Sequence, residues 1–166
     1  MAALLDHVDP DGLLEFSVVF TDRSLNHMSA SFKQVMIDIS DMLKQVYCAD
    51  AIAIVPGGGT FGMEAVARQF GRDAKVMVVR NGWFSYRWSQ IFEAGGFTSD
   101  THVIKARQSD NGAQAAFSPA PIDTVVAQIR ADKPDVVFAP HVETSAGVIL
   151  PDAYICLLYT SPSPRD

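Results

Sequence analysis

The sequence has few cysteines, little basic charge and no long apolar run. Its two cysteines, Cys48 and Cys156, are isolated, which excludes a disulfide framework and a cysteine metal site. Against 13 Lys and Arg stand 19 Asp and Glu, and the net charge of -6 argues against a general nucleic-acid surface. No apolar run approaches the roughly 20 residues that cross a bilayer, and the N-terminus lacks a secretory signal pattern. We therefore expect a cytoplasmic protein whose partners include neither nucleic acid nor membrane.

What the sequence does contain is an alternation of helical and extended patterns in a chain that is 48% hydrophobic and 19% charged. The patterns predict helices at about 30–47, 61–70, 84–94 and 122–131, and strands at about 50–55, 75–80, 101–105 and 135–139. Strands that alternate with helices are typical of the α/β class, with a mostly parallel sheet flanked by helices. Ligands bind beyond the carboxyl ends of such strands. Three polar loops follow predicted strands, at 57–61, 81–86 and 141–147.

The first of these loops, Pro56–Gly62, is rich in glycine and leads into a predicted helix. Free N–H groups at a helix start and close backbone approach at glycine suit an anion. Gly57-x-Gly59-x-x-Gly62 also matches the dinucleotide fingerprint, although Arg80 stands near the place where that fingerprint has an acid, so that at best the 2′-phosphate of NADP would fit. A phosphate cup for a smaller cofactor and a ligand-free connecting turn are the other two interpretations.

The other two loops carry aromatic and hydroxyl side chains. Four aromatic residues lie at 83–88, in and just after the second loop, and an aromatic side chain at the mouth of a sheet can stack on a planar ligand. The third loop combines His141, Glu143, Thr144 and Ser145, but the chain has no G-x-S-x-G elbow, which disfavours a serine hydrolase. The histidines lack metal-ligand spacing.

Three blocks of the sequence, Pro56–Ala65, Asn81–Arg87 and His141–Gly147, together resemble the class V aminotransferases. They occur in the family's order and are similar in particular to the alanine–glyoxylate and serine–pyruvate branch. Asn26–Ser29 resembles the early His-x-Ser turn of the family, so the resemblance covers about residues 16–155. It implies part of the large domain of a type I fold that uses pyridoxal 5′-phosphate. It also implies an aminotransferase that acts on a small amino acid and a 2-oxo acid, and a homodimer for the full-length protein.

The resemblance also assigns roles to individual residues. It implies that Gly58, Gly59 and Thr60 hold the cofactor phosphate and that Phe84 stacks on the pyridine ring. It implies that Thr144 donates a hydrogen bond to the phenolic oxygen of the ring, with Ser145 as the alternative. The chemistry agrees, because a phosphate needs convergent donors, a flat ring needs an apolar plate and a phenolate needs a hydroxyl donor.

Two residues that the family needs for catalysis are expected to lie beyond the third block. These are the carboxylate at the pyridine nitrogen and the Schiff-base lysine. The lysines that precede that block, Lys33, Lys44, Lys75, Lys105 and Lys133, do not match the family's position. We therefore name no catalytic residue, and we expect the chain as written to be an inactive fragment.

The last residues, 156–166, resemble the in-frame translation of the transposase adapter used in sequencing-library preparation. We therefore expect the native sequence, residues 1–155, to be the N-terminal part of the large domain and the last eleven residues to lie outside the fold. Two alternatives to the aminotransferase hypothesis remain. One is an NADP-binding oxidoreductase domain that uses Gly57–Gly62, and the other is a non-catalytic truncated scaffold.

Overall fold

The computed structural model describes residue 27 and residues 30–161, and it divides the chain into two compact units, Met1–Val55 and Pro56–Asp166. The first unit contains helix α1 (Ala30–Tyr47), as its apolar periodicity predicts. The turn expected at Asn26–Ser29 lies outside the described residues except for His27. Since the two units are separate bodies, each is described by itself.

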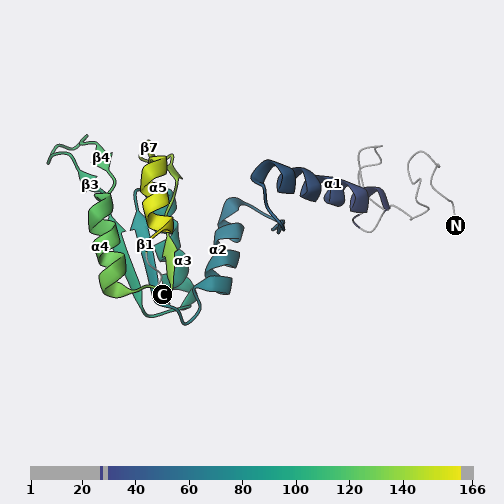
Figure 1. Ribbon diagram of the computed structural model, residues 1–166, viewed down its shortest axis with the longest axis horizontal. Coiled ribbons are helices and arrows are strands. Elements are labelled where there is room, and N and C mark those ends of the chain that lie inside the picture. The colour runs from purple at the N-terminus through teal and green to yellow at the C-terminus, as the bar shows by residue number, and fades with distance from the viewer. Residues whose placement is uncertain (1–26, 28–29, 162–166) are drawn as a thin grey trace. The chain divides into compact units, whose positions relative to one another are not determined.

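The second unit is built from alternating helices and strands (Figure 1). In chain order its elements are α2 (Gly59–Phe70), β1 (Val76–Arg80), α3 (Trp83–Gly95), β2 (Thr101–Lys105), β3 (Arg107–Gln108), β4 (Phe117–Ser118), α4 (Ile122–Asp132), β5 (Val136–Phe138), β6 (Val142–Glu143), β7 (Val148–Ile149) and α5 (Asp152–Tyr159). The α/β class predicted from the sequence is confirmed.

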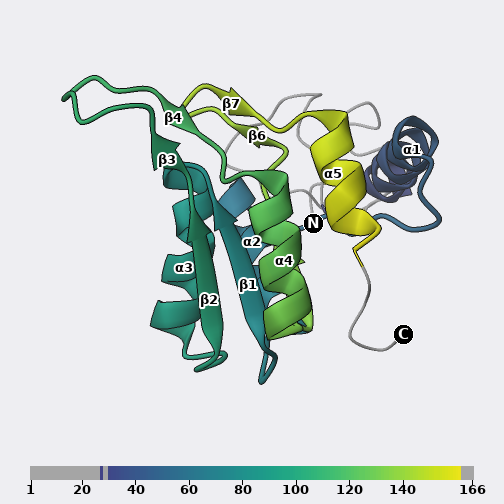
Figure 2. The same cartoon turned by 60° about the vertical axis from the view of Figure 1, so that its left-hand side comes forward.

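The central sheet is parallel and has the strand order β2-β1-β5. The chain passes from β1 to β2 through α3 and then returns past β1 to β5 through α4. Because parallel crossovers are right-handed, this reversal of direction places α3 and α4 on opposite faces of the sheet. Figure 2 shows α3 on one side of the strands and α4 with α5 on the other.

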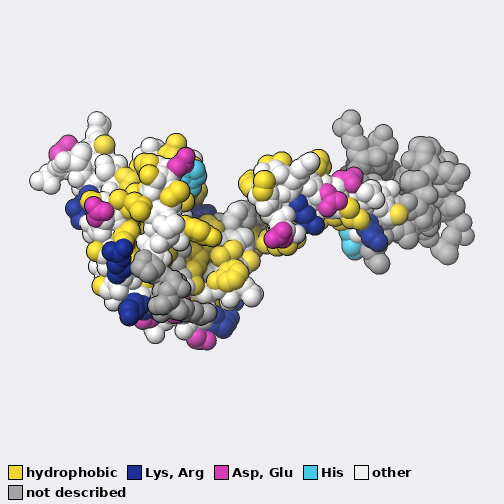
Figure 3. Space-filling model, viewed as in Figure 1, with side chains coloured by type: hydrophobic (Ala, Val, Ile, Leu, Met, Phe, Trp, Pro, Cys, Tyr) yellow, Lys and Arg dark blue, Asp and Glu magenta, His cyan; other side chains and the backbone are white. Residues whose placement is uncertain are grey.

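The surface of the second unit mixes charges of both signs. Figure 3 shows acidic and basic side chains interspersed with apolar ones on the face in view. That face therefore has no broad basic area of the kind that binds nucleic acid. Among the described residues, no helix combines the length and the apolar character needed to cross a membrane.

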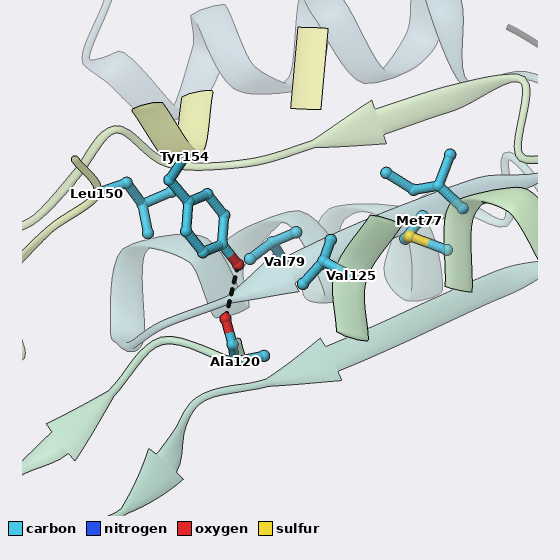
Figure 4. Packing of buried hydrophobic residues seen from close by; sticks show 7 residues of the cluster. Met77, Val79, Ala120, Val125, Leu150 and Tyr154 are labelled. Atoms are coloured by element: carbon cyan, nitrogen blue, oxygen red, sulfur yellow. Dashed lines mark hydrogen bonds between the residues drawn. The ribbon is translucent and has the colours of Figure 1, made fainter. Parts of the chain in front are cut away.

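Two clusters of buried side chains cover the two faces of β1. Alternate residues of a strand point to opposite faces. Val78 accordingly joins a cluster with Phe92 of α3, whereas Val79 joins a cluster with α4 and α5. In the second cluster the Tyr154 hydroxyl donates a 2.9 Å hydrogen bond to the Ala120 carbonyl (Figure 4). Burial on both faces explains why β1 reads as a continuous apolar run.

The structure differs from the sequence-based expectation at one strand and two loops. Residues 51–55 have the composition of a strand but belong to no strand in the described chain, because a strand forms only where a neighbour accepts its backbone bonds. Residues 107–118 and 142–149, for which the sequence pattern predicts no strand, each contain a short antiparallel pair, β3 with β4 and β6 with β7. These two-residue strands are too short to show a period in the sequence.

The helix α5 also reaches into the segment that we expected to lie outside the fold. It continues to Tyr159, and Leu158 packs against the cluster that contains Tyr154. Asp152 in its first turn complements the helix dipole. Of this segment, residues 162–166 lie outside the described residues.

Candidate functional site

The glycine-rich loop turns sharply into α2. Gly57 has a φ of +119°, and a Cβ added there would lie 2.4 Å from the Phe61 ring, so this position requires glycine. Gly58 is the N-cap, with an extended backbone, and Gly59 begins the helix. A Cβ added at Gly58 or Gly59 would meet nothing within 4 Å. Neither backbone conformation nor internal packing therefore accounts for these two glycines, and the space beside them is open.

The N-terminus of α2 also lacks a cap from the part of the chain that the structure describes. No side chain of the described residues accepts a hydrogen bond from its N–H groups, although the Phe61 N–H reaches the Gly58 carbonyl at 2.9 Å. The N–H groups at the start of a helix need acceptors, and the helix dipole makes this end positive. Open space, small residues and free donors together make an end that suits an anion.

Thr60 at this helix end is linked to α3 by Arg87. Arg87 Nη1 donates a 2.6 Å hydrogen bond to Thr60 Oγ1, and its guanidinium carbon lies 5.7 Å from the centroid of the Phe84 ring. Because Oγ1 accepts from Arg87, the hydroxyl proton of Thr60 is available to another acceptor. No carboxylate of the described residues lies within 4.0 Å of Arg87, so its charge stays uncompensated beside α2.

The N-terminus of α3, in contrast, is capped by the chain itself. Glu143 accepts hydrogen bonds from the N–H groups of Phe84 at 3.1 Å and Ser85 at 2.8 Å, and from the Ser85 hydroxyl at 2.6 Å. The Ser145 hydroxyl donates to the same carboxylate and accepts from the Trp83 N–H at 2.8 Å. These bonds fix the β6–β7 turn, which carries the third predicted loop, against the first turn of α3.

The capping carboxylate is buried, with Glu143 only 1% exposed. Burial raises the pKa of Glu143, but hydrogen bonds from the Ser145 and Ser85 side chains and from the backbone outweigh that effect and lower the pKa from its usual 4.5. Glu143 is therefore ionised at neutral pH, which is the state that favours a helix N-terminus.

The two hydroxyl residues of the third loop differ in their availability. The Ser145 hydroxyl is used as donor and as acceptor within the cap. Thr144 is exposed, and its side chain makes no hydrogen bond to the described residues. The arrangement leaves Thr144 as the residue of this pair with a free donor.

Comparisons with known proteins bear on this arrangement. No family model matches the chain. A 2-aminoethylphosphonate–pyruvate transaminase of Pseudomonas putida is 28% identical over 133 residues, which cover 78% of this chain and 32% of the relative. The small subunit of a soluble hydrogenase of Synechococcus sp. is 29% identical over 127 residues, which cover 75% of this chain and 31% of that protein.

Two solved structures are similar in fold. The ureidoglycine–glyoxylate aminotransferase of Bacillus subtilis has a TM-score of 0.65 at 20% identity, with 84% of this chain and 34% of that chain covered. The alanine–glyoxylate aminotransferase of Nostoc sp. has a TM-score of 0.60 at 23% identity, with coverages of 76% and 32%. The chain has the class V aminotransferase fold. It spans about a third of the length of these relatives.

Within this class V aminotransferase fold, the first two turns of α3 connect the three predicted loops. Thr60 reaches α3 through Arg87, and the third loop reaches it through Glu143 and Ser145. Phe84, which lies in the first of these turns, is 45% exposed. Gly58, Gly59 and Thr144 are exposed as well, and the Thr144 side chain makes no hydrogen bond to the described residues. Among the sequence-predicted positions, Thr60 and Ser145 are thus hydrogen-bonded to α3, Phe84 lies in it, and the others have no hydrogen bond to it in the described chain.

The dinucleotide interpretation requires a strand before the glycine turn that pairs with the next strand, as in a βαβ unit. Residues 51–55 form no such strand in the described chain, and the neighbours of β1 are β2 and β5. In the part of the chain that the structure describes, the glycine turn therefore does not follow a paired strand.

Sequence reasoning missed the roles of Arg87 and Glu143. The signal for Arg87 is its position three residues after Phe84, which places both side chains on one face of a helix. The signal for Glu143 is less direct. Gly82 at the N-cap of α3 has no side chain to accept a hydrogen bond, so the cap had to come from elsewhere in the chain.

Proposed function

We propose that this chain forms the phosphate-binding part of a pyridoxal-phosphate-dependent aminotransferase that transfers an amino group between a small amino acid and a small 2-oxo acid. The observation that carries the proposal is the open, glycine-lined N-terminus of α2 beside the uncompensated Arg87. The class V aminotransferase fold supports it. Pyruvate and glyoxylate in the names of the relatives support a small 2-oxo acid as acceptor.

The residues at this end fit the phosphate of the cofactor. Backbone N–H groups at Gly58, Gly59 and Thr60 supply donors, and the absence of Cβ atoms at the two glycines lets a phosphate approach. The Thr60 hydroxyl adds a donor because its oxygen already accepts from Arg87. Arg87 adds a positive charge, which strengthens hydrogen bonds to an anion.

The ring of the cofactor would be held by residues at the α3 end. Phe84 offers a half-exposed aromatic face, and Thr144 offers a free hydroxyl for the phenolic oxygen. Ser145 then serves by fixing the loop through Glu143 rather than by binding the ring. Bound pyridoxal phosphate supplies an electron sink for bonds that break at the amino acid's α-carbon.

The proposal assigns phosphate binding to this chain and amino-group transfer to the longer protein. The chain spans about a third of its relatives. A homodimer of the longer protein is part of the proposal and rests on the family resemblance.

The test is a titration of the chain with pyridoxal 5′-phosphate and with pyridoxal, which lacks the phosphate, followed by absorbance. We expect the phosphorylated compound to bind more tightly. Thr60→Val removes the hydroxyl at constant shape, and its affinity for pyridoxal phosphate should fall about 10- to 100-fold, the effect of one hydrogen bond to a charged group. Affinity for pyridoxal should not change.

The matched control is Thr124→Val, an exposed threonine on α4 at the other face of the sheet. It should bind both compounds as the unmodified chain does. Equal affinity of the unmodified chain for pyridoxal and its phosphate would overturn the proposal.

A further inference from the structure

A pocket of about 430 Å³ lies where β1 and β2 end. Its wall includes Arg80, Asn81, Trp83, Lys105, Phe117 and Ser145. It includes none of the residues that we propose contact the cofactor, Gly58, Gly59, Thr60, Phe84 and Thr144, although it adjoins them through the supporting residue Ser145. The carboxyl edge of a parallel sheet is where ligands bind in α/β proteins.

Two cations lie side by side at this edge. Arg80 and Lys105 are register partners on the neighbouring strands β1 and β2, and partners across two strands face the same side of the sheet. Like charges placed in this way repel each other. No carboxylate of the described residues lies within 4.0 Å of either cation, although the chain as a whole has a net charge of -6. An anion between them would relieve this repulsion.

Aromatic side chains form another part of the wall. Trp83 is 57% exposed and Phe117 is 46% exposed, which is unusual for residues with so much apolar area. Trp83 packs at 5.7 Å on Tyr86, whose ring also lies 4.9 Å from the guanidinium of Arg80. Tyr86 therefore fixes one cation and one aromatic wall relative to each other.

One residue of the wall, Asn81, has a buried side-chain amide without a partner among the described residues. Asn81 is 2% exposed, and both polar atoms of its side chain lack a hydrogen-bond partner. Its backbone N–H is satisfied by the Ser85 hydroxyl, so the deficit concerns the side chain alone. Buried polar groups are normally paired, and an exception indicates a missing partner.

We propose that this pocket binds an organic anion with a planar ring, whose carboxylate or phosphate lies between Arg80 and Lys105. The ring lies against Trp83 and Phe117. This site goes beyond the proposed cofactor function and does not depend on it.

The experiment uses a Trp88→Phe background, in which Trp83 is the sole tryptophan and its fluorescence reports on the pocket. The probes are benzoate, phenylphosphate, inorganic phosphate and the neutral benzyl alcohol. We expect saturable changes with the two aromatic anions and weaker binding of the other two. Calorimetry on the chain with both tryptophans repeats the measurement without the background substitution.

Two variants with the same change of charge test the location. Lys105→Gln should weaken binding of the aromatic anions about tenfold, since it removes one charged partner. Lys75→Gln, just before β1 at the opposite edge of the sheet, should change it less than about twofold, because solvent and salt screen a distant charge.

Each outcome bears on the proposal. Equal losses of affinity for the aromatic anions in Lys105→Gln and Lys75→Gln would overturn it. So would the absence of saturable binding of either aromatic anion. Equal affinity for inorganic phosphate and phenylphosphate would overturn the ring-binding part. Loss of phenylphosphate binding in Thr60→Val, with Lys105→Gln unaffected, would place that probe at the start of α2 and also count against the pocket. The preference for pyridoxal phosphate over pyridoxal is measured separately, so failure of one proposal is distinguishable from failure of the other.

Discussion

Helices α2 and α3 both begin at an N-cap glycine, but their N-termini are completed in different ways. At α3, the carboxylate of Glu143 accepts hydrogen bonds from the first turn, and Gly82 packs directly against it. At α2, no side chain of the described residues accepts from the first turn, and Gly58 has open space beside it. The positive helix end is thus neutralised from within the chain at α3, whereas at α2 we propose that an external anion neutralises it.

The capped N-terminus of α3, here called the closed end, also supports the uncapped N-terminus of α2, the open end. Arg87 extends from the second turn of α3 to Thr60, so the capped helix carries the cation that lies beside the uncapped helix. Since Glu143 fixes the start of α3, it indirectly fixes Arg87 and Phe84. A binding site of this kind needs such supporting contacts to hold its donors in place.

Removing the internal anion should have the largest effect. In Glu143→Ala, the N–H groups of Phe84 and Ser85 and the hydroxyls of Ser85 and Ser145 lose their acceptor. We expect the free energy of unfolding to fall by about 2–4 kcal/mol, measured by urea denaturation, because a helix cap and several buried hydrogen bonds are lost together.

Glu143→Gln keeps the shape and one acceptor oxygen, so it should lose less. Glu93→Ala, an exposed acid on the same helix, should change stability by no more than about 0.5 kcal/mol. Equal losses in Glu143→Ala and Glu93→Ala would show that the cap does not stabilise the fold.

The open and closed ends differ in how far the sequence predicts them. The glycine turn that leads into a helix at Gly57–Thr60 is a local pattern. Periodicity and glycine signals predict the positions of α2, β1 and α3 to within about two residues. The cap at α3 joins residues that are 58–62 positions apart, such as Ser85 with Glu143 and Trp83 with Ser145. No local pattern records such a pairing.

The same distinction explains the errors. Residues 51–55 were predicted as a strand from composition, but a strand depends on a neighbour that composition does not supply. The family resemblance identified Phe84 and Thr144 as site residues but did not show that Arg87 connects Thr60 to α3. That link follows from the packing of α2 on α3, which is a tertiary property.

Matched glycine substitutions compare the two ends directly. In Gly82→Ala, the new Cβ would lie 2.6 Å from Glu143 Cγ and from Ser145 Oγ, so we expect a loss of about 1–3 kcal/mol from overpacking. In Gly58→Ala, the Cβ meets nothing within 4 Å. The loss should be about 0.5–1 kcal/mol, since alanine is a poorer N-cap than glycine.

Binding of pyridoxal phosphate should show the opposite order. Gly58→Ala puts a methyl group where the phosphate approaches, so its affinity for pyridoxal phosphate should fall more than that of Gly82→Ala. Urea denaturation and absorbance titration of the two variants give both quantities. A larger stability loss in Gly58→Ala than in Gly82→Ala would contradict the comparison.

Acidification should weaken the closed end and leave the open end unchanged, with a smaller effect than the substitutions. Because the pKa of Glu143 is lowered in the folded protein, its ionised form stabilises the fold above the usual value of 4.5, and this contribution is lost as the pH falls through the folded pKa. Between pH 5 and pH 3 the free energy of unfolding should therefore drop more in the unmodified chain than in Glu143→Gln, which has no group to protonate there.

Amide hydrogen exchange resolves the same effect by position. Protection of the Phe84 and Ser85 amides, corrected for intrinsic exchange rates, should decline on acidification because both donate to Glu143. The Thr60 amide has no titrating acceptor among the described residues, so its protection should follow only global stability. If Thr60 lost protection in step with Ser85 while global stability was unchanged, the two helix ends would be coupled through Arg87 more strongly than through the fold as a whole.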